Sequence, residues 1–139
     1  CFKEISNTGV LDKKIKEKNY FNTSAALIKQ SLNEMEIIVR HLKGNKKTVY
    51  GLAGLGDLYV SSIGGRNSLM GSYIGSGLTY SEAKKNKMKN ITVEGAELAF
   101  EIGKYIKKDF NKKKMPLMMS MLDVLINDKK LKINWNNFE

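Results

Sequence analysis

One short stretch of the sequence combines an acid, an arginine and several glycines. Asp57 follows residues 51–56, which include three glycines, and a glycine pair at 64–65 comes directly before Arg66 and Asn67. Asp57 is the only charged residue of this stretch before Arg66, so we expect its carboxylate to be buried and to need a partner. Arg66 and Asn67 open a predicted helix, whose free N–H groups and partial positive charge favour an anion. The stretch therefore predicts a site for a phosphate or carboxylate group.

The choice of arginine strengthens this hypothesis. The chain has 24 lysines and arginines together, and only Arg40 and Arg66 are arginines. A guanidinium grips phosphate or carboxylate through two parallel bonds, which a lysine ammonium does not do. The other interpretation, a glycine-rich turn between helices with a surface arginine, stays open at this point.

Composition bounds the class of protein. A chain of 139 residues with 42% hydrophobic and 27% charged residues fits one soluble globular domain. One cysteine and one histidine exclude a disulfide framework and argue against a zinc site, so we expect no metal. We see no membrane helix and no signal peptide, and expect a cytoplasmic location. The start at Cys1, without an initiator methionine, suggests a fragment or a processed chain.

The formal charge of +10 raises the question of nucleic acid. The lysines are scattered in at least four places, at residues 13–18, 84–89, 104–114 and 129–132. This scatter favours a solvated surface over a single basic groove. A non-catalytic module that binds nucleic acid through its lysines remains the alternative from another functional class.

The apolar pattern predicts helices throughout. The clearest helix begins at 22–24, carries apolar residues at 28, 32, 35, 39 and 42, and ends at Lys43 and the C′ glycine Gly44. Arg40 and His41 lie off that apolar stripe, and we interpret both as surface residues. We expect a short helix capped by Thr48 and running to residue 54, a helix over 57–63, and a helix over 67–75 that Gly77 ends.

The second half follows the same pattern. Residues 79–82 form a capping box that starts a lysine-rich helix ending near residue 88. Thr92 is the expected cap of the next helix, whose buried face comprises Val93, Ala96, Ala99 or Phe100, Gly103 and Ile106. Pro116 marks the first position of a further helix, and residues 128–139 are expected to form a short last helix that Trp135 packs. We interpret the methionines as core residues. The prediction is an all-α bundle of about six or seven helices.

The chain lacks the marks of a nucleotide-binding fold. No segment alternates between strand and helix, and glycines at 51, 54 and 56 have the wrong spacing for a dinucleotide fingerprint. No Walker lysine follows them.

Residues 22–27, 51–58, 65–67 and 93–95 together resemble the C-terminal domain of NAD(P)-dependent glycerol-3-phosphate dehydrogenase. The resemblance covers roughly residues 22–127. It implies an all-helical substrate domain, like the C-terminal domains of the 6-phosphogluconate dehydrogenase-like group, that follows an N-terminal Rossmann domain. We then expect residues 1–139 to form the one helical domain, with an irregular connector over 1–21 and the Rossmann domain absent from this chain. The implied enzyme is a cytoplasmic homodimer that interconverts dihydroxyacetone phosphate and sn-glycerol 3-phosphate with NAD or NADP.

The resemblance also assigns roles to residues. Asp57 would be the acid beside the catalytic centre. The substrate phosphate would be held by Ser62, Gly65, Arg66 and Asn67, and the cofactor would be reached by Arg66, Thr92 and Glu94. The family's lysine lies in a Lys-Asn-aliphatic motif that this chain lacks, because Lys3 is followed by Glu4 and Ile5; we expect that lysine upstream of the chain. The fragment alone should be inactive. A related two-domain dehydrogenase with another substrate stays open.

Overall fold

A computed structural model describes residues 21–138 of the chain. The expected connector over 1–21 lies outside the described residues except for Phe21, which is the first residue of α1. Lys3 also lies outside them.

Six α-helices run through the described residues: α1 (Phe21–His41), α2 (Asp57–Ile63), α3 (Arg66–Gly75), α4 (Tyr80–Asn86), α5 (Glu94–Asp109) and α6 (Pro116–Asn127). Two 3-10 turns, η1 (Lys46–Tyr50) and η3 (Trp135–Asn137), and a π-helical turn, η2 (Leu52–Gly56), lie between or after them. No strand occurs between residues 21 and 138, so the predicted all-α fold is confirmed. No helix in this range is both long enough and apolar enough to span a bilayer.

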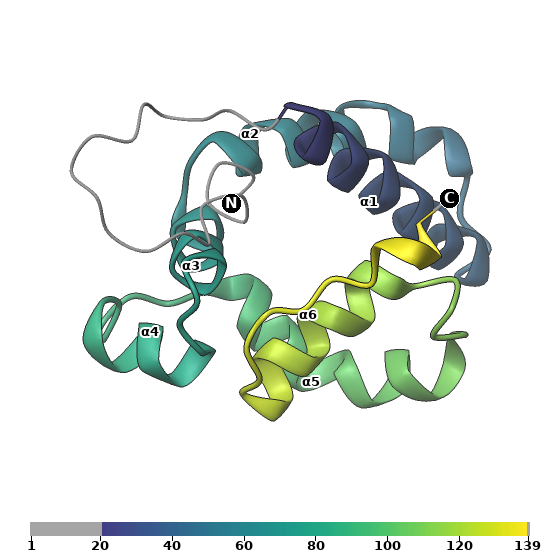
Figure 1. Ribbon diagram of the computed structural model, residues 1–139. Coiled ribbons are helices and arrows are strands. Elements are labelled where there is room, and N and C mark those ends of the chain that lie inside the picture. Colours follow the sequence, from purple (N-terminus) through teal and green to yellow (C-terminus); the bar gives the residue numbers. More distant parts are fainter. Residues whose placement is uncertain (1–20, 139) are drawn as a thin grey trace.

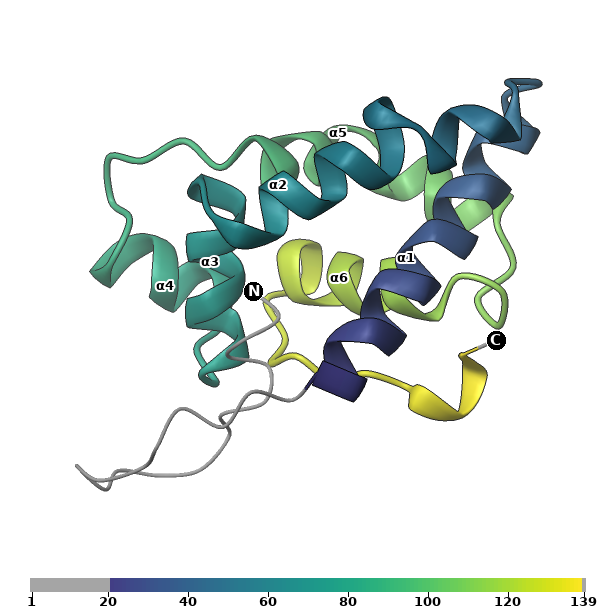
Figure 2. The ribbon, with the colours of Figure 1, turned by 90° about the horizontal axis from the view of Figure 1, so that it is seen from above.

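The helices form a ring. Figure 1 shows α1 and α2 along one edge, α5 and α6 along the other, and α3 joining the two edges, with α4 outside the ring beside α3. The view from above in Figure 2 shows α1 crossing the end of α6, which it contacts. A cavity of about 360 Å³ lies between α1, α2, α3, α5 and α6.

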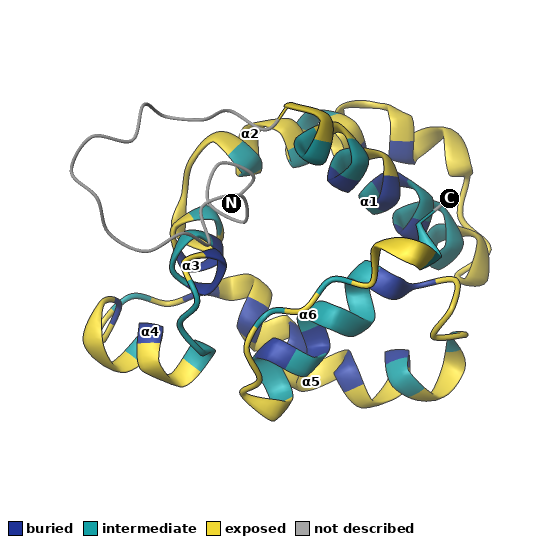
Figure 3. Cartoon of the chain, in the orientation of Figure 1, coloured by how far each residue is buried: buried dark blue, intermediate teal, exposed yellow. Residues whose placement is uncertain are grey.

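Two clusters of buried apolar residues form the core, and Figure 3 shows buried positions in dark blue on α1, α3, α4, α5 and α6. One cluster joins α3, α4, α5 and α6 through Met70, Ile74, Ala83, Met88, Val93, Ala96 and Val124. A second joins α5 and α6 through Ala99, Ile106 and Leu122. The predicted buried face of α5 is confirmed with Ala99 on it, because Phe100 is 46% exposed. Met70, Met88 and Met115 are buried, as expected of core methionines.

The buried face of α1 differs from the predicted apolar stripe. Leu42 is 72% exposed, whereas Glu34 and Gln30 are almost fully buried. Glu34 accepts hydrogen bonds from the backbone N–H groups of Leu117 (2.8 Å) and Met118 (2.7 Å), and so caps the first turn of α6 from another helix. Gln30 donates to the same carboxylate at 2.8 Å. Burial raises the pKa of Glu34, and these hydrogen bonds oppose that rise.

Capping residues, proline and glycine predict several helix ends correctly. Thr79 and Glu82 form the capping box at the start of α4, and Pro116 is the first residue of α6. Gly77 has a φ of 101° after α3, a left-handed conformation that glycine adopts without strain. Leu78 N–H then donates to the Tyr73 carbonyl, which completes the end of the helix.

Other predicted ends are wrong. The turn at 46–50 is capped by Asn45, whose Oδ1 accepts from the Lys47 N–H at 3.0 Å, and not by Thr48. At the end of α1 the left-handed residue is Lys43 (φ 59°) and not Gly44. Gly44 instead avoids a tight contact, because a Cβ there would lie 3.0 Å from Val39 Cγ1 and 3.2 Å from the Val39 carbonyl oxygen.

The predicted helix over 128–139 is reduced to the 3-10 turn η3. Asp128 takes a left-handed conformation (φ 51°) that ends α6, and residues 129–134 run on without helix. Asp128 accepts from the Ser81 N–H at 2.8 Å and from the Thr79 hydroxyl at 3.2 Å, so it holds the start of α4. The Trp135 ring packs against Phe138, with ring centroids 4.9 Å apart.

Candidate site at the start of α3 and α5

The N-termini of α3 and α5 meet at the candidate site. Arg66 is the first residue of α3 and Glu94 is the first residue of α5, and an Arg66 Nη2–Glu94 Oε1 ion pair joins them. Both side chains are about half exposed, at 55% and 51%. The pair therefore lies at the surface, where a ligand has access to both groups.

Asn67 makes the second link between these helices. Its Oδ1 accepts a hydrogen bond from the Gly95 N–H at 3.1 Å, which satisfies one free donor in the first turn of α5. A Cβ on Gly95 would lie 3.1 Å from the same oxygen, so glycine allows this close approach. Asn67 thus caps α5, and the predicted cap by Thr92 is wrong: Val93 is the N-cap residue and makes no side-chain capping bond.

The start of α3 has no side-chain cap. Gly65 is its N-cap residue, with a φ of 100° that favours glycine, and Gly65 O accepts from the Leu69 N–H at 3.0 Å. The N–H groups of the first turn point out of the helix end, where they attract an anion. The guanidinium N–H groups of Arg66 and the backbone N–H groups of the first turn of α3 therefore lie close together as hydrogen-bond donors.

Ser62 lies next to this helix start. Its carbonyl accepts from the Ser68 hydroxyl at 3.3 Å, and its own hydroxyl donates to the Tyr59 carbonyl at 2.7 Å. The Ser62 hydroxyl must leave that internal bond to donate to a ligand. Ser62, Asn67 and Gly95 also line one side of the central cavity, whose remaining lining is mostly apolar.

Asp57 is exposed, so the expectation of a buried carboxylate is wrong. No hydrogen bond or ion pair joins Asp57 to Arg66, Asn67 or Glu94 in the described part of the chain. The reason is that the stretch around Asp57 lies on the surface: its large apolar side chains are exposed as well, with Leu52 at 90% and Ile63 at 69%. Tyr59 and Val60 of the same stretch are exposed too, at 61% and 67%.

The structure brings the predicted site residues Arg66, Asn67 and Glu94 together, and the sequence analysis did not predict how they contact one another. The ion pair and the Asn67–Gly95 cap each join residues 28 positions apart. No local sequence signal predicts these two contacts, because the pairing rule for helices covers residues only three or four positions apart. Thr92 is exposed and lies two residues before Glu94, the first residue of α5.

The comparison with protein families decides the membership of the chain. Residues 8–135 match the family described as "NAD-dependent glycerol-3-phosphate dehydrogenase C-terminus". The chain belongs to this family. The matched range contains all six α-helices and both helix starts of the candidate site.

Individual relatives agree with the family match. A glycerol-3-phosphate dehydrogenase [NAD(P)+] of Phytoplasma mali is 33% identical over 120 residues, which cover 84% of this chain and 35% of the relative. One from Bacillus cytotoxicus is 32% identical over 116 residues, 80% of this chain and 32% of the relative. An NADP(+)-dependent glycerol-3-phosphate dehydrogenase of Archaeoglobus fulgidus is 33% identical over 93 residues, 63% of this chain and 28% of the relative. The chain spans about a third of the length of these relatives. No solved structure matches it significantly.

Proposed function

We propose that this chain is the substrate-binding domain of an NAD(P)-dependent glycerol-3-phosphate dehydrogenase, which interconverts sn-glycerol 3-phosphate and dihydroxyacetone phosphate. The observation that carries the proposal is the place of Arg66 and Asn67 at the uncapped start of α3, beside the start of α5, in a chain of this family. Residues 1–139 would form one helical domain, and the dinucleotide-binding half would belong to another part of the protein.

Arg66 would be the main phosphate ligand. Its guanidinium has five N–H donors, so it has the capacity to keep its bond to Glu94 and still donate two parallel bonds to a phosphate. The backbone N–H groups after Gly65 would add donors from the helix end, and the Asn67 amide nitrogen and the Ser62 hydroxyl would complete the phosphate site. The Glu94 carboxylate holds the guanidinium in place before substrate arrives.

Asp57 would act on the proton donor of the reaction. Reduction of a ketone needs a proton at its oxygen, and a lysine beside a carboxylate is suited to supply it. Asp57 is exposed on a surface with several exposed apolar side chains, which suits a position where another part of the protein covers it. The lysine itself would come from outside the described residues.

The nicotinamide cofactor would contact this chain at the surface of the same site. Arg66 and Glu94 present an exposed cation and an exposed carboxylate, and Thr92 adds an exposed hydroxyl, a set that fits the phosphates and hydroxyls of NAD or NADP. The cofactor supplies the hydride when bound. The full-length protein would be a homodimer and would be located in the cytoplasm.

Steady-state kinetics of the full-length protein with glycerol 3-phosphate test the phosphate site. Arg66→Lys replaces two parallel bonds by one point contact. Loss of one charge-assisted bond of about 1.5–3 kcal/mol lowers kcat/KM by roughly 10- to 150-fold. The control is Arg40→Lys, because Arg40 is exposed and its ion pair at 2.6 Å is with Glu36 of its own helix. Equal kinetics of the two variants would refute the phosphate role of Arg66.

The same assay separates the role of Asp57. Asp57→Asn removes a charge without removing a phosphate ligand, so it should lower kcat more than it raises KM. A change confined to KM would contradict the proposed action on the proton donor. The isolated chain should show no dehydrogenase activity with added NAD, and the full-length protein should prefer glycerol 3-phosphate over unphosphorylated glycerol. Preference for an unphosphorylated alcohol would favour a related dehydrogenase with another substrate.

A further inference from the structure

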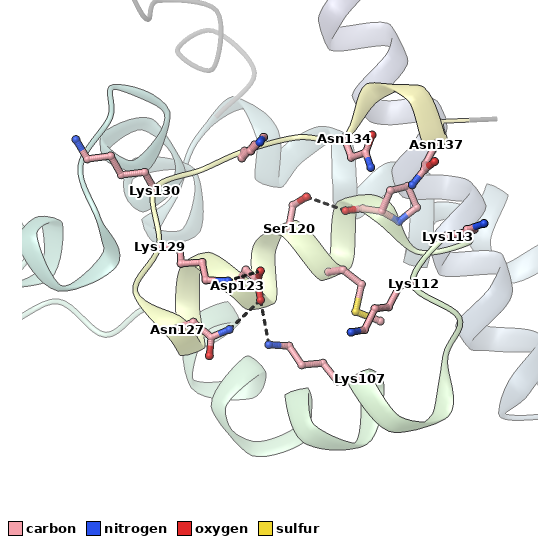
Figure 4. Close-up of a pocket in the computed structure, with 13 residues that line it drawn as sticks. Lys107, Lys112, Lys113, Ser120, Asp123, Asn127, Lys129, Lys130, Asn134 and Asn137 are labelled. Atoms are coloured by element: carbon pink, nitrogen blue, oxygen red, sulfur yellow. Dashed lines mark hydrogen bonds and ion pairs between the residues drawn. The ribbon is translucent and has the colours of Figure 1, made fainter.

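A basic pocket of about 680 Å³ lies on the outer face of α6, beneath the C-terminal segment that follows this helix (Figure 4). The lysines of this basic pocket come from three parts of the chain: Lys107 from α5, Lys112 and Lys113 from the α5–α6 connection, and Lys129, Lys130 and Lys132 from the segment after α6. Polar side chains of Ser120, Asp123, Asn127, Asn134 and Asn137 share the lining. The lysines of the pocket belong to two runs that are separate in the sequence, so only the fold brings them together.

The charge of the basic pocket is strongly unbalanced. The lining contains six lysines and one carboxylate, that of Asp123, which leaves an excess of five positive charges. The whole chain has a formal excess of ten. The fold brings six lysines from two separate runs, 104–114 and 129–132, to this one pocket.

Asp123 shows how the floor of the pocket holds anionic oxygens. Lys107 Nζ lies 3.2 Å from Oδ1 and Lys129 Nζ lies 3.1 Å from Oδ2, and the Asn127 amide donates to Oδ1 at 2.8 Å. Figure 4 shows these three donors converging on the carboxylate from different elements. Lys129 and Lys107 lower the pKa of Asp123, so the carboxylate stays charged and holds both ammonium groups in place.

Four lysines remain without a carboxylate partner in the described part of the chain: Lys112, Lys113, Lys130 and Lys132. All four are exposed at the rim of the pocket. A concave surface with an excess of positive charge attracts anions, and an anion with several charges has the capacity to contact more than one of these lysines.

We propose that the basic pocket binds a small soluble polyanion that carries two or more linked phosphate groups. The pocket is concave and its size falls in the range of small-molecule sites, whereas a nucleic-acid backbone needs an extended basic stripe or groove. Its asparagine amides and lysines are donors, as phosphate oxygens require. The pocket is separate from the candidate site at Arg66 and Glu94: Lys107 lies thirteen residues after Glu94 along α5, about 20 Å at the helical rise.

Calorimetric titration of the chain with inorganic tripolyphosphate tests the proposal. We expect one site that binds tripolyphosphate at least about tenfold more tightly than orthophosphate at equal ionic strength, because several lysines act together. Trp135 is the only tryptophan of the chain and directly follows Asn134 of the lining, so its fluorescence should report the same titration. A parallel titration with ATP shows whether the phosphates are recognised alone, by equal affinity, or on a nucleoside, by tighter affinity.

Two matched triple variants separate the pocket from the general charge of the chain. Lys112→Gln, Lys130→Gln and Lys132→Gln together should weaken tripolyphosphate binding by roughly tenfold or more. The control removes the same charge at three exposed lysines on and after α4, Lys85, Lys87 and Lys89, and should change the affinity by less than about twofold.

Three results would overturn the proposal. Equal weakening in both triple variants would mean that the chain binds anions through its overall charge. Tripolyphosphate binding no tighter than that of orthophosphate would remove the multivalent site. Binding of a single-stranded oligonucleotide without any binding of tripolyphosphate would assign the lysines to nucleic acid instead. Circular dichroism of each triple variant confirms that the helices are intact, since all six substituted lysines are exposed.

Discussion

Replacing Gly54 by alanine would place a carbon atom against the backbone of the preceding turn. The new Cβ would lie 2.1 Å from the Val49 carbonyl oxygen and 2.6 Å from the Val49 carbonyl carbon and Cα. A relaxed contact between carbon and a carbonyl oxygen is roughly 3.3 Å or longer. The backbone must therefore separate by about 1 Å, and no flexible side chain is present at this contact to absorb the shift.

The expected cost follows from two opposing effects. Overpacking of this kind costs about 1–3 kcal/mol, and the upper end applies because the obstacle is backbone. Alanine regains about 1 kcal/mol over glycine within a helix. The net loss in the free energy of unfolding is about 2 kcal/mol, which lowers the melting temperature by roughly 8 °C for a chain of this size.

Thermal and urea unfolding, followed by circular dichroism, measure this loss. The matched control is Gly64→Ala, because a Cβ on Gly64 meets nothing within 4 Å and its φ of −162° is extended backbone open to any residue. This control should stay within about 0.5 kcal/mol of the wild type. If Gly54→Ala were as stable as Gly64→Ala, the close approach of Gly54 to the Val49 backbone would not be the reason for a glycine there.

Two further predictions concern caps that reach from one helix to another. Glu34→Ala leaves the first-turn N–H groups of α6 without their acceptor and should lower the free energy of unfolding by about 2 kcal/mol or more. The control Glu101→Ala, at an exposed position of α5, should change the free energy of unfolding by less than about 0.5 kcal/mol. Equal melting temperatures of the two variants would contradict the capping role of Glu34. The hydrogen bond from the Ser81 N–H lowers the pKa of Asp128 below its ordinary value of 3.8. The charged Asp128 carboxylate therefore stabilises the folded state fully at a pH above 3.8. This stabilisation disappears as the pH falls through the lowered pKa of the folded state. Wild type should therefore melt above Asp128→Asn at neutral pH and converge with it in acid; a difference independent of pH would show that the charge is not involved, since asparagine also tolerates the left-handed backbone of this residue.

Much of the fold could be predicted because its signals are local. The capping box at Thr79, the proline that opens α6 and the left-handed Gly77 each act within a few residues, so their sequence neighbours suffice to identify them. The apolar face of α5 repeats at the helical period and was assigned correctly for the same reason. The predictions failed where a partner distant in the sequence takes over, as when Asn67 caps α5 in place of Thr92.

The candidate site shows the same division. The types and spacing of Gly65, Arg66 and Asn67 predicted a helix start suited to an anion, and α3 begins at Arg66. The expectation of a buried Asp57 failed, because burial depends on what covers the stretch and not on how few charges lie in it. The Arg66–Glu94 ion pair needed the packing of α3 against α5 before it could be seen.

By itself, then, the sequence determined the helical periodicity, the local helix ends and the chemistry available at the start of α3. Only the tertiary structure decided which polar groups meet: Glu34 with the start of α6, and Asp128 with the start of α4. It also decided that lysines after α5 and lysines after α6 line one pocket. The physical reason is that a helix end leaves several N–H groups unpaired, and any acceptor that the packing brings within about 3 Å satisfies them. Periodicity places a side chain on one face of its helix, but the partner on the next helix depends on how the two helices pack.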